Sequence, residues 1–340
     1  MIKIPEQPKI EVNLIDRMAR GYQIAKVLNT AVDMDIFTRL ERSKTAEEIS
    51  KETESNPLLM RKFLNVLVSL QLLSKKDDTY TKTQLSEIFL TKDNPFYQGN
   101  LINLELKDYE VWSKLDQALK DKVNLRLPQL ENTFDKRFIL AMAEANMRGP
   151  LYKVTKAISD LAEFKSAKRL LDLGGGHGLH AIALVQENAQ LEGVIFDLPP
   201  VVEVAKKVIS QYQMEGRVKV IGGDYMKDDI GNGYDIIFVS HTFYKPKEQV
   251  FPLLKKIHAA LNREGLAILN HWILSEDGTA SEVVTLWDLW LSLLGYHPHI
   301  YTKDEAKIWL EEAGFSLQNI VDISTPPDPS ILVIGRKEDK

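Results

Sequence analysis

The chain has 340 residues, a formal net charge of −5, 44% hydrophobic residues, 27% charged residues and no cysteine. This composition is typical of a globular protein with one large or two ordinary domains. The acidic balance argues against a nucleic-acid partner, and no apolar run reaches the ~18 residues that a membrane span needs. The sequence begins without the continuous apolar stretch of a signal peptide. Disulfides, thiolate catalysis and Cys-ligated metals are excluded, and we expect a cytoplasmic location.

Residues 13–90 are predicted to form short helices followed by a polar hairpin. Residues 24–40 (IAKVLNTAVDMDIFTRL) carry apolar side chains at helical spacing. Thr45 and Glu48 have the spacing of a capping box, and Asn56 followed by Pro57 is typical of a helix start. Residues 73–83 (LSKKDDTYTKT) resemble two short strands around a turn. Three helices and a hairpin predict a winged helix.

A winged helix commonly binds DNA, but the helix that would enter the groove does not fit that task. Residues 58–73 (LLMRKFLNVLVSLQLL) are apolar on most of the helix circumference and carry only Arg61 and Lys62 as charged groups. A recognition helix needs polar side chains for the base edges, whereas a helix that is apolar all round is buried. We therefore interpret residues 1–105 as an all-helical winged-helix dimerisation domain, and we expect a homodimer.

The second domain is predicted to span residues 106–340, with residues 106–165 forming a helical connector. From residue 169 onward, short runs rich in Val, Ile and Leu alternate with helical segments. The predicted strands are 169–173, 192–198, 218–224, 234–240 and 266–274, and helices are predicted at 200–212 and 248–261. This alternation predicts an α/β fold, a Rossmann-like parallel sheet with helices on both faces.

The segment RLLDLGGGHGLHAIAL, residues 169–184, is a glycine-rich turn between a strand and a helix. A dinucleotide remains one reading, because Gly176, Gly178 and Ala181 fit G-x-G-x-x-A and Asp197 follows about 20 residues later. However, Asp172 would repel a pyrophosphate at this turn. S-adenosylmethionine (AdoMet) carries an ammonium and a sulfonium instead, which an aspartate favours. The turn also occurs half way along the chain, whereas dinucleotide domains usually begin with it.

Five stretches together resemble one family, the AdoMet-dependent O-methyltransferases of the caffeic-acid, hydroxyindole and polyketide-tailoring type. They are LLDLGGGHG, FDLPPVVEVAK, GGDYM, ALNREGLAILN and WLEEAGF, and the stretches from residue 31 to 73 are similar to that family's dimerisation domain. The resemblance implies a class I methyltransferase fold, AdoMet as the cofactor and a small-molecule methyl acceptor.

The resemblance also implies which residues bind AdoMet. Gly174 and Gly176 would pass close to its methionine part, near Asp172. Asp197 would accept hydrogen bonds from both ribose hydroxyls. The adenine would lie against Leu198 and Tyr225, with Asp224 accepting from its amino group and the backbone of Ser240 lining its other side. Two alternatives stay open, since Asp197 could instead cap the helix that begins at Pro199 and Asp224 could close a turn.

The catalytic positions depart from the family pattern. Phe243 or Tyr244 occupies the place of the general-base histidine, His271 that of the acid which orients it, and Ile300 that of a later glutamate. A phenol with a pKa of about 10 is a poor base at neutral pH, so His271 or His241 is the better candidate. Either histidine could also be a plain polar group at a strand end.

The predicted function is transfer of a methyl group from AdoMet to a small molecule, at a hydroxyl of an aromatic or otherwise apolar compound. Met142, Trp287 and Trp290, together with Phe138, are expected to wall the acceptor pocket, although ordinary core packing would explain each of them. The His297–His299 pair with His271 suggests a metal site only weakly, so no metal is predicted. Two other functions stay open: an AdoMet-binding relative that has lost or changed methyl transfer, and a winged-helix regulator with a ligand-sensing domain.

Overall fold

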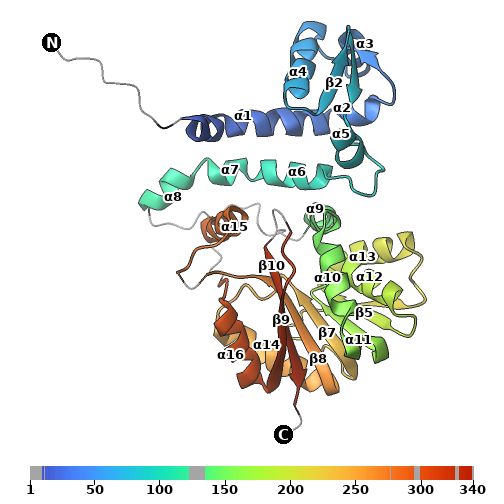
Figure 1. Cartoon of the computed structure of the whole chain (residues 1–340), viewed down its shortest axis with the longest axis vertical. Helices are drawn as coiled ribbons and strands as arrows, with labels where there is room; N and C mark the ends of the chain where they lie inside the picture. The colour runs from blue at the N-terminus through green and yellow to red at the C-terminus, as the bar shows by residue number, and fades with distance from the viewer. Residues whose placement is uncertain are drawn as a thin grey trace, which may run out of the picture. The chain divides into compact units, whose positions relative to one another are not determined.

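The computed structural model describes residues 10, 12–121, 135–275, 277–294, 299–325 and 329–338. The chain divides into two compact units, Met1–Lys107 and Asp108–Lys340 (Figure 1). Among the described residues, no helix is both long and apolar enough to cross a membrane.

The first unit is mainly helical. Its described helices are α1 (Asn13–Asp33), α2 (Ile36–Arg39), α3 (Ala46–Glu52), α4 (Pro57–Ser69), α5 (Gln84–Phe89) and α6 (Gly99–Lys107). The predicted helix starts are confirmed: Thr45 and Glu48 form a reciprocal capping box before α3, and Asn56 Oδ1 accepts from Leu59 N at 3.0 Å at the start of α4. These caps satisfy backbone N–H groups that have no partner inside a helix.

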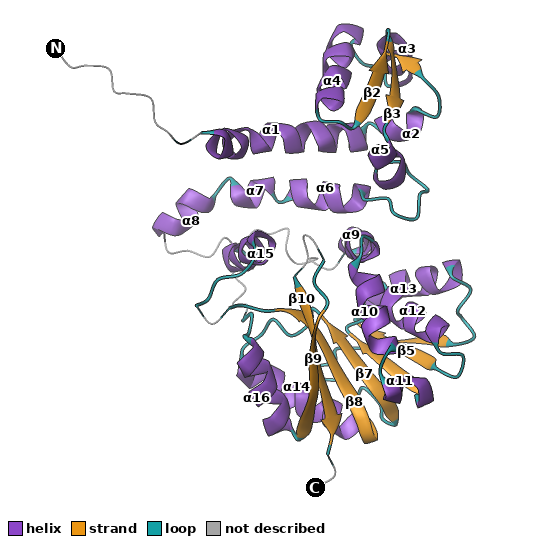
Figure 2. Ribbon diagram, in the orientation of Figure 1, coloured by secondary structure: helices purple, strands orange, loops and turns teal. Residues whose placement is uncertain are grey.

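Two expectations for this unit are corrected. The unit is not all-helical, because β1 (Lys44–Thr45), β3 (Thr79–Lys82) and β2 (Leu73–Lys76) form a three-stranded antiparallel sheet in that order (Figure 2). Two of these strands, β2 and β3, are the predicted hairpin, which is confirmed. The helix α4 is also not buried all round. It buries one stripe inside the unit, while Leu58 and Leu59 are 67% and 66% exposed. Its remaining apolar surface faces outward from this unit.

The second unit contains a seven-stranded sheet with the order β6-β5-β4-β7-β8-β10-β9. Its strands are β4 (Arg169–Leu173), β5 (Glu192–Asp197), β6 (Val218–Gly222), β7 (Tyr234–Ser240), β8 (Leu261–Trp272), β9 (Phe315–Asp322) and β10 (Ser330–Lys337). The strands from β6 to β8 run parallel, and β10 pairs antiparallel with both β8 and β9. The five predicted strands are therefore present.

Helices cover both faces of this sheet, which confirms the predicted α/β class (Figure 2). One apolar core lies under α10 (Pro150–Ser159), α11 (Ala162–Ser166), α12 (Leu179–Glu187) and α13 (Pro199–Gln211), and the other lies under α14 (Lys247–Ala260) and α16 (Lys303–Ala313). The unit also contains α7 (Tyr109–Trp112), α8 (Leu115–Asp121), α9 (Lys136–Met147) and α15 (Glu282–Leu293).

The strand order reverses at β4, which lies between β5 and β7. In open α/β sheets such a reversal leaves a crevice at the carboxyl ends of the strands, and ligands bind there. A ligand site is therefore expected at the segments that follow β4, β5 and β7.

Candidate functional site

The glycine turn after β4 has a backbone that other residues cannot adopt easily. Gly174, Gly176 and Gly178 have φ angles of 72°, 54° and 78°. A Cβ on Gly174 would lie 2.8 Å from Thr242 Oγ1, and one on Gly178 would lie 2.5 Å from Ile195 Cδ1. In contrast, a Cβ on Gly176 would meet nothing within 4 Å. The turn is thus closely packed at Gly174 and Gly178 and open at Gly176, where a ligand can approach the backbone.

Asp197 ends β5 with its carboxylate turned toward this opening. Its Oδ2 accepts from Gly176 N at 2.8 Å, and its Oδ1 accepts from Leu198 N at 2.7 Å. Burial raises the pKa of this carboxyl, and the two backbone donors partly offset that effect. The residue at the N-cap of α13 is Leu198, without a side-chain cap, so Asp197 does not cap the helix.

Asp172 lies directly beneath the glycine turn. It is 1% exposed, and a Cβ on Gly175 would lie 2.7 Å from its Cγ. Among the described residues, no hydrogen-bond donor meets the distance and angle criteria for either carboxylate oxygen of Asp172. Burial raises its pKa to about 7, which the N–H of Ala181 offsets only in part. A cation near the turn would favour the ionised form.

Asp224 and Tyr225 follow β6. Asp224 Oδ1 accepts from Met226 N at 3.0 Å and its Oδ2 lies 2.9 Å from Lys227 Nζ, so the carboxylate does close a turn. Its side chain is still 33% exposed and can accept further hydrogen bonds. Tyr225 is half-buried, and burial raises the pKa of its phenol to about 12.

The carboxyl ends of β7 and β8 are joined by polar contacts. Ser240 pairs with Asn270, whose Nδ2 donates to Ser240 Oγ at 2.9 Å. The next residue, His241, has a φ of 49°, and its N–H donates to Asn270 O at 2.9 Å. His241 Nδ1 and Tyr244 Oη lie 2.5 Å apart. The structure therefore brings two of the three candidate catalytic residues into direct contact.

Aromatic rings surround this pair. Tyr244 lies 4.5 Å from Trp287 between ring centroids, and Trp272 lies 5.3 Å from Trp287 and 5.2 Å from His241. His241, Tyr244, Trp272 and Trp287 are all half-buried. We call these four residues the aromatic cluster. Within it, the rings of Trp272 and Trp287 form an apolar wall beside the hydrogen-bonded pair.

His271, the third candidate base, is fully buried behind the aromatic cluster. Its ring stacks on Phe243 at 5.7 Å and contacts the rings of Tyr244 at 5.0 Å and Tyr301 at 5.3 Å. Neither ring nitrogen has a hydrogen-bond partner among the described residues. Desolvation, with a smaller contribution from His241, lowers its pKa well below the usual value, so the imidazole is neutral.

The residues expected to wall an acceptor pocket do not form one cluster. Trp287 joins the aromatic cluster, whereas Trp290 packs with Val111, Leu293 and neighbouring apolar residues of α7 and α8. Phe138 packs against α13, and Met142 lies on α9, where its carbonyl accepts from Asn146 Nδ2 at 3.0 Å.

Sequence reasoning missed His177, which lies inside the glycine turn. Its Nδ1 accepts from Leu179 N at 3.0 Å, and its Nε2 lies 3.3 Å from Asn146 Nδ2. Burial lowers its pKa to about 4, so this imidazole is neutral and links the glycine turn to α9. The sequence indicates a role for His177 only through its place in the glycine-rich stretch GGGHGLH. The contact with Asn146, which lies on a distant helix, cannot be read from spacing.

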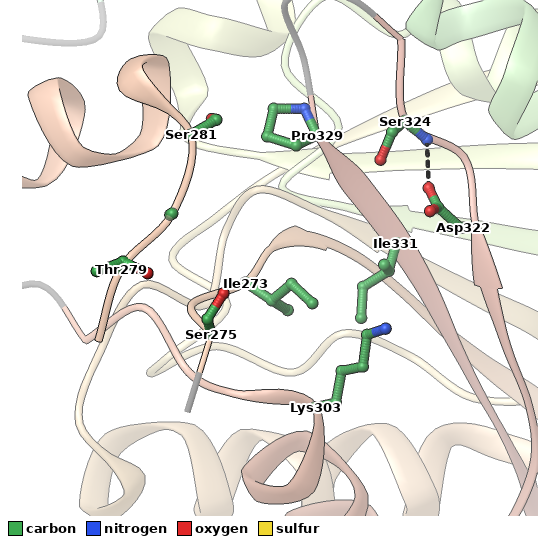
Figure 3. Close-up of a pocket in the computed structure, with 10 residues that line it drawn as sticks. Ile273, Ser275, Thr279, Ser281, Lys303, Asp322, Ser324, Pro329 and Ile331 are labelled. Atoms are coloured by element: carbon green, nitrogen blue, oxygen red, sulfur yellow. Dashed lines mark hydrogen bonds between the residues drawn. The ribbon is translucent and has the colours of Figure 1, made fainter. Parts of the chain in front are cut away.

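A separate groove of about 280 Å³ opens beside the end of β8 (Figure 3). None of the predicted site residues lines it. Its walls are Ile273, Ser275, Thr279, Ala280, Ser281, Lys303, Asp322, Ser324, Pro329 and Ile331. Figure 3 shows Asp322 bonded to the backbone N–H of Ser324, a contact of 2.8 Å.

The weak metal pattern gains no support from the geometry. His299 Nε2 lies 3.0 Å from Glu305 Oε1 and its ring stacks on Trp309. His297 lies outside the described residues. Within the part of the chain that the structure describes, no group of three potential ligands is gathered around one point.

The fold and the position of the site together define a class I methyltransferase. Residues 127–316 match the O-methyltransferase domain family, and residues 17–92 match the O-methyltransferase dimerisation domain. The chain therefore belongs to the O-methyltransferase family, whose members methylate small molecules with AdoMet, and the predicted resemblance is confirmed. The match of the first unit also supports the dimerisation interpretation over DNA binding.

Individual relatives cover nearly the whole chain. It is 32% identical over 339 residues to an uncharacterized protein of Methanocaldococcus jannaschii, a match that covers 95% of this chain and 90% of that one. It is 25% identical over 331 residues to the N,N-dimethyltransferase OxyT of Streptomyces rimosus, covering 94% of each. Human N-acetylserotonin methyltransferase, solved with SAM, superposes with a TM-score of 0.83 at 19% identity, over 99% of this chain and 100% of that one.

Proposed function

We propose that this chain binds AdoMet at the carboxyl ends of β4 and β5 and transfers its methyl group to a small-molecule acceptor. One observation carries the proposal. Asp197 holds its carboxylate against Gly176 N, beside the open space over Gly176. A carboxylate at this position can accept from two vicinal hydroxyls, which a ribose offers.

The charges around the turn favour AdoMet over a dinucleotide. Asp197 and Asp224 lie at the carboxyl ends of β5 and β6, and a pyrophosphate there would meet their like charges in a partly dry site. AdoMet carries an ammonium and a sulfonium instead. The residues present therefore fit AdoMet, and when bound it would supply an electrophilic methyl group.

We assign the remaining contacts to AdoMet by their place in the fold. Gly174 and Gly176 would approach its methionine part, because the turn is open at Gly176. Leu198 is 38% exposed at the end of β5 and would pack on the adenine. Asp224 would accept from the amino group at the adenine edge, and Tyr225 would lie against the face of the ring. The backbone of Ser240 would line the other side of the adenine.

The acceptor in this proposal is a hydroxyl group on an aromatic or otherwise apolar compound. The aromatic cluster supplies flat apolar surface for it, with Trp287 as the wall residue nearest the candidate bases. Met142 and Trp290 remain proposed wall residues of α9 and α15. Displacement at a methyl carbon gains much of its acceleration from alignment, which rigid walls provide.

Binding of the proposed cofactor is tested by calorimetry with AdoMet, S-adenosylhomocysteine and NAD. We expect the first two to bind and NAD not to bind. Asp197→Ala should weaken AdoMet binding by about 1.5–3 kcal/mol, the cost of losing hydrogen bonds to a charged group. Glu203→Ala, which removes an exposed carboxylate from α13, is the matched control. Unchanged affinity in Asp197→Ala would refute the assignment.

A member that binds AdoMet without transferring its methyl group is the competing function. Incubation with AdoMet and an extract of small molecules separates the two. An enzyme converts AdoMet into S-adenosylhomocysteine when an acceptor is present, and a protein that has lost the reaction does not.

A further inference from the structure

We propose that His241 and Tyr244 act as one proton-accepting pair, with the Tyr244 oxygen contacting the acceptor and His241 receiving the proton. The inference rests on the proposed methyl transfer to a hydroxyl. It differs from the family pattern, in which a single histidine is the base, and from a choice between separate candidate residues. Four structural observations support it.

The first observation is the backbone that turns His241 toward Tyr244. His241 leaves β7 with a φ of 49°, a left-handed conformation that non-glycine residues seldom adopt. Its N–H is fixed to Asn270 O, and Asn270 is itself bonded to Ser240. Residues held in such a strained conformation cluster at functional sites. The surrounding strand ends thus hold the imidazole in place.

The second observation is the hydrogen bond itself. His241 Nδ1 and Tyr244 Oη lie 2.5 Å apart, and Trp272 N approaches the same oxygen at 3.5 Å. A neutral imidazole accepts at one nitrogen and donates at the other. With the phenol donating to Nδ1, the imidazole carries its own proton on Nε2. A phenol oxygen is an acceptor as well as a donor, so it can take a proton from another group as it gives up its own.

The third observation is the support behind Tyr244. His271 contacts the Tyr244 ring edge-to-face at 5.0 Å and is fully buried among rings. Because His271 cannot be reached from solvent, it positions the Tyr244 ring and does not meet the acceptor. The fourth is Trp287, 4.5 Å from Tyr244 on α15, which makes the surroundings of the pair apolar. The positive charge that the sulfonium loses during transfer appears on His241, so the net charge of the site does not change.

The acceptor O–H bond breaks and its proton moves to Tyr244 Oη, while the phenol proton moves to His241 Nδ1. The acceptor oxygen uses the released electron pair to bond the methyl carbon, and the carbon–sulfur pair stays on sulfur as a thioether. His241 ends as an imidazolium, which then loses its proton to water.

The first test needs no acceptor. Nitrogen-edited spectra of the histidine imidazoles in the full-length protein report which ring nitrogen carries the proton, and His241→Asn identifies the signal. Asn tolerates the left-handed backbone, so the variant should fold. We expect His241 to be protonated at Nε2 and to shift in Tyr244→Phe. Protonation at Nδ1 would overturn the proposal.

The second test is single-turnover transfer from radiolabelled AdoMet to a panel of naphthols and substituted phenols. We expect Tyr244→Phe and His241→Asn each to lose ~10²-fold or more in rate, and the double variant to lose no more than the worse single one. The loss should shrink as the phenol becomes more acidic, which a structural defect would not produce. Tyr301→Phe, which removes the hydroxyl of another ring that contacts His271, should keep its rate.

Rates within threefold of the original protein in both single variants would refute the pair. If no panel member accepts the methyl group, the imidazole spectrum decides alone. Failure of AdoMet to bind in calorimetry would refute the proposed function instead, so the two failures are distinguishable.

Discussion

At the scale of single residues, the motif positions could be predicted and the proton chemistry could not. Asp197 follows from the Asp-Leu-Pro-Pro motif, and the structure places it at the glycine turn. The free pKa values of imidazole and phenol favoured His271 or His241 over Tyr244 as the base. Burial of that ring and the contact between His241 and Tyr244 depend on a left-handed residue at the end of β7, which no spacing in the sequence indicates.

Asp172 should make stability depend on pH. Its folded-state pKa of about 7 lies above the usual value, so the folded protein keeps a proton that the unfolded chain releases between about pH 4 and 7. Rising pH in that window therefore destabilises the fold. Asp172→Asn removes this effect, and its stability relative to the original protein should increase by about 2–4 kcal/mol from pH 4 to pH 8.

Urea unfolding of the ligand-free protein at several pH values checks this expectation. Titration of the other carboxyls is common to both proteins and cancels in the difference. A difference that does not change with pH would show that Asp172 is ionised in the folded state.

At the scale of elements, periodicity predicted the parallel strands because each is a short apolar run buried on both faces. The antiparallel strands β9 and β10 were not predicted. The strand β9 is half exposed, with Gln318 and Asn319 facing outward, and its register shifts against β10 beside Gly335. The burial of α4 was predicted wrongly for this unit. Apolar residues around a whole helix predict that it is buried, but they do not show whether its own unit or another chain covers it.

The glycine turn should be intolerant of side chains. Gly178→Ala combines a φ of 78° with a contact of 2.5 Å to Ile195, so we expect a loss of at least about 1–3 kcal/mol in unfolding free energy. Gly216→Ala is the control in the same unit, because a Cβ there meets nothing within 4 Å and its φ is not left-handed. Thermal denaturation measures both. Equal stability of the two variants would contradict the steric argument.

At the scale of the whole molecule, two units could be predicted from the change in periodicity along the chain. The sequence placed their boundary between residues 105 and 106, and the compact units meet after Lys107. The oligomeric state follows less directly, since it depends on surface that one chain leaves uncovered. We propose a homodimer formed through the first unit, which matches a dimerisation domain.

The helix α1 offers surface for that dimer. Ile15, Met18 and Tyr22 form a stripe along it and are 66%, 69% and 58% exposed. A stripe this apolar is rarely left in water. Replacing Met18 and Tyr22 with Glu should convert the dimer into a monomer, measured by light scattering, without changing AdoMet affinity. A double variant that stays dimeric would place the interface elsewhere.

The direction of β10 has a practical consequence for handling the protein. Because β10 runs antiparallel to β8, Lys337 at its end lies near the start of β8 and far from the carboxyl ends of the parallel strands. An affinity handle, a fluorescent reporter or a surface tether joined after this strand would therefore point away from the crevice. Immobilisation by this end would leave the crevice open to solvent, which makes surface-based screening for the acceptor practicable with the full-length chain.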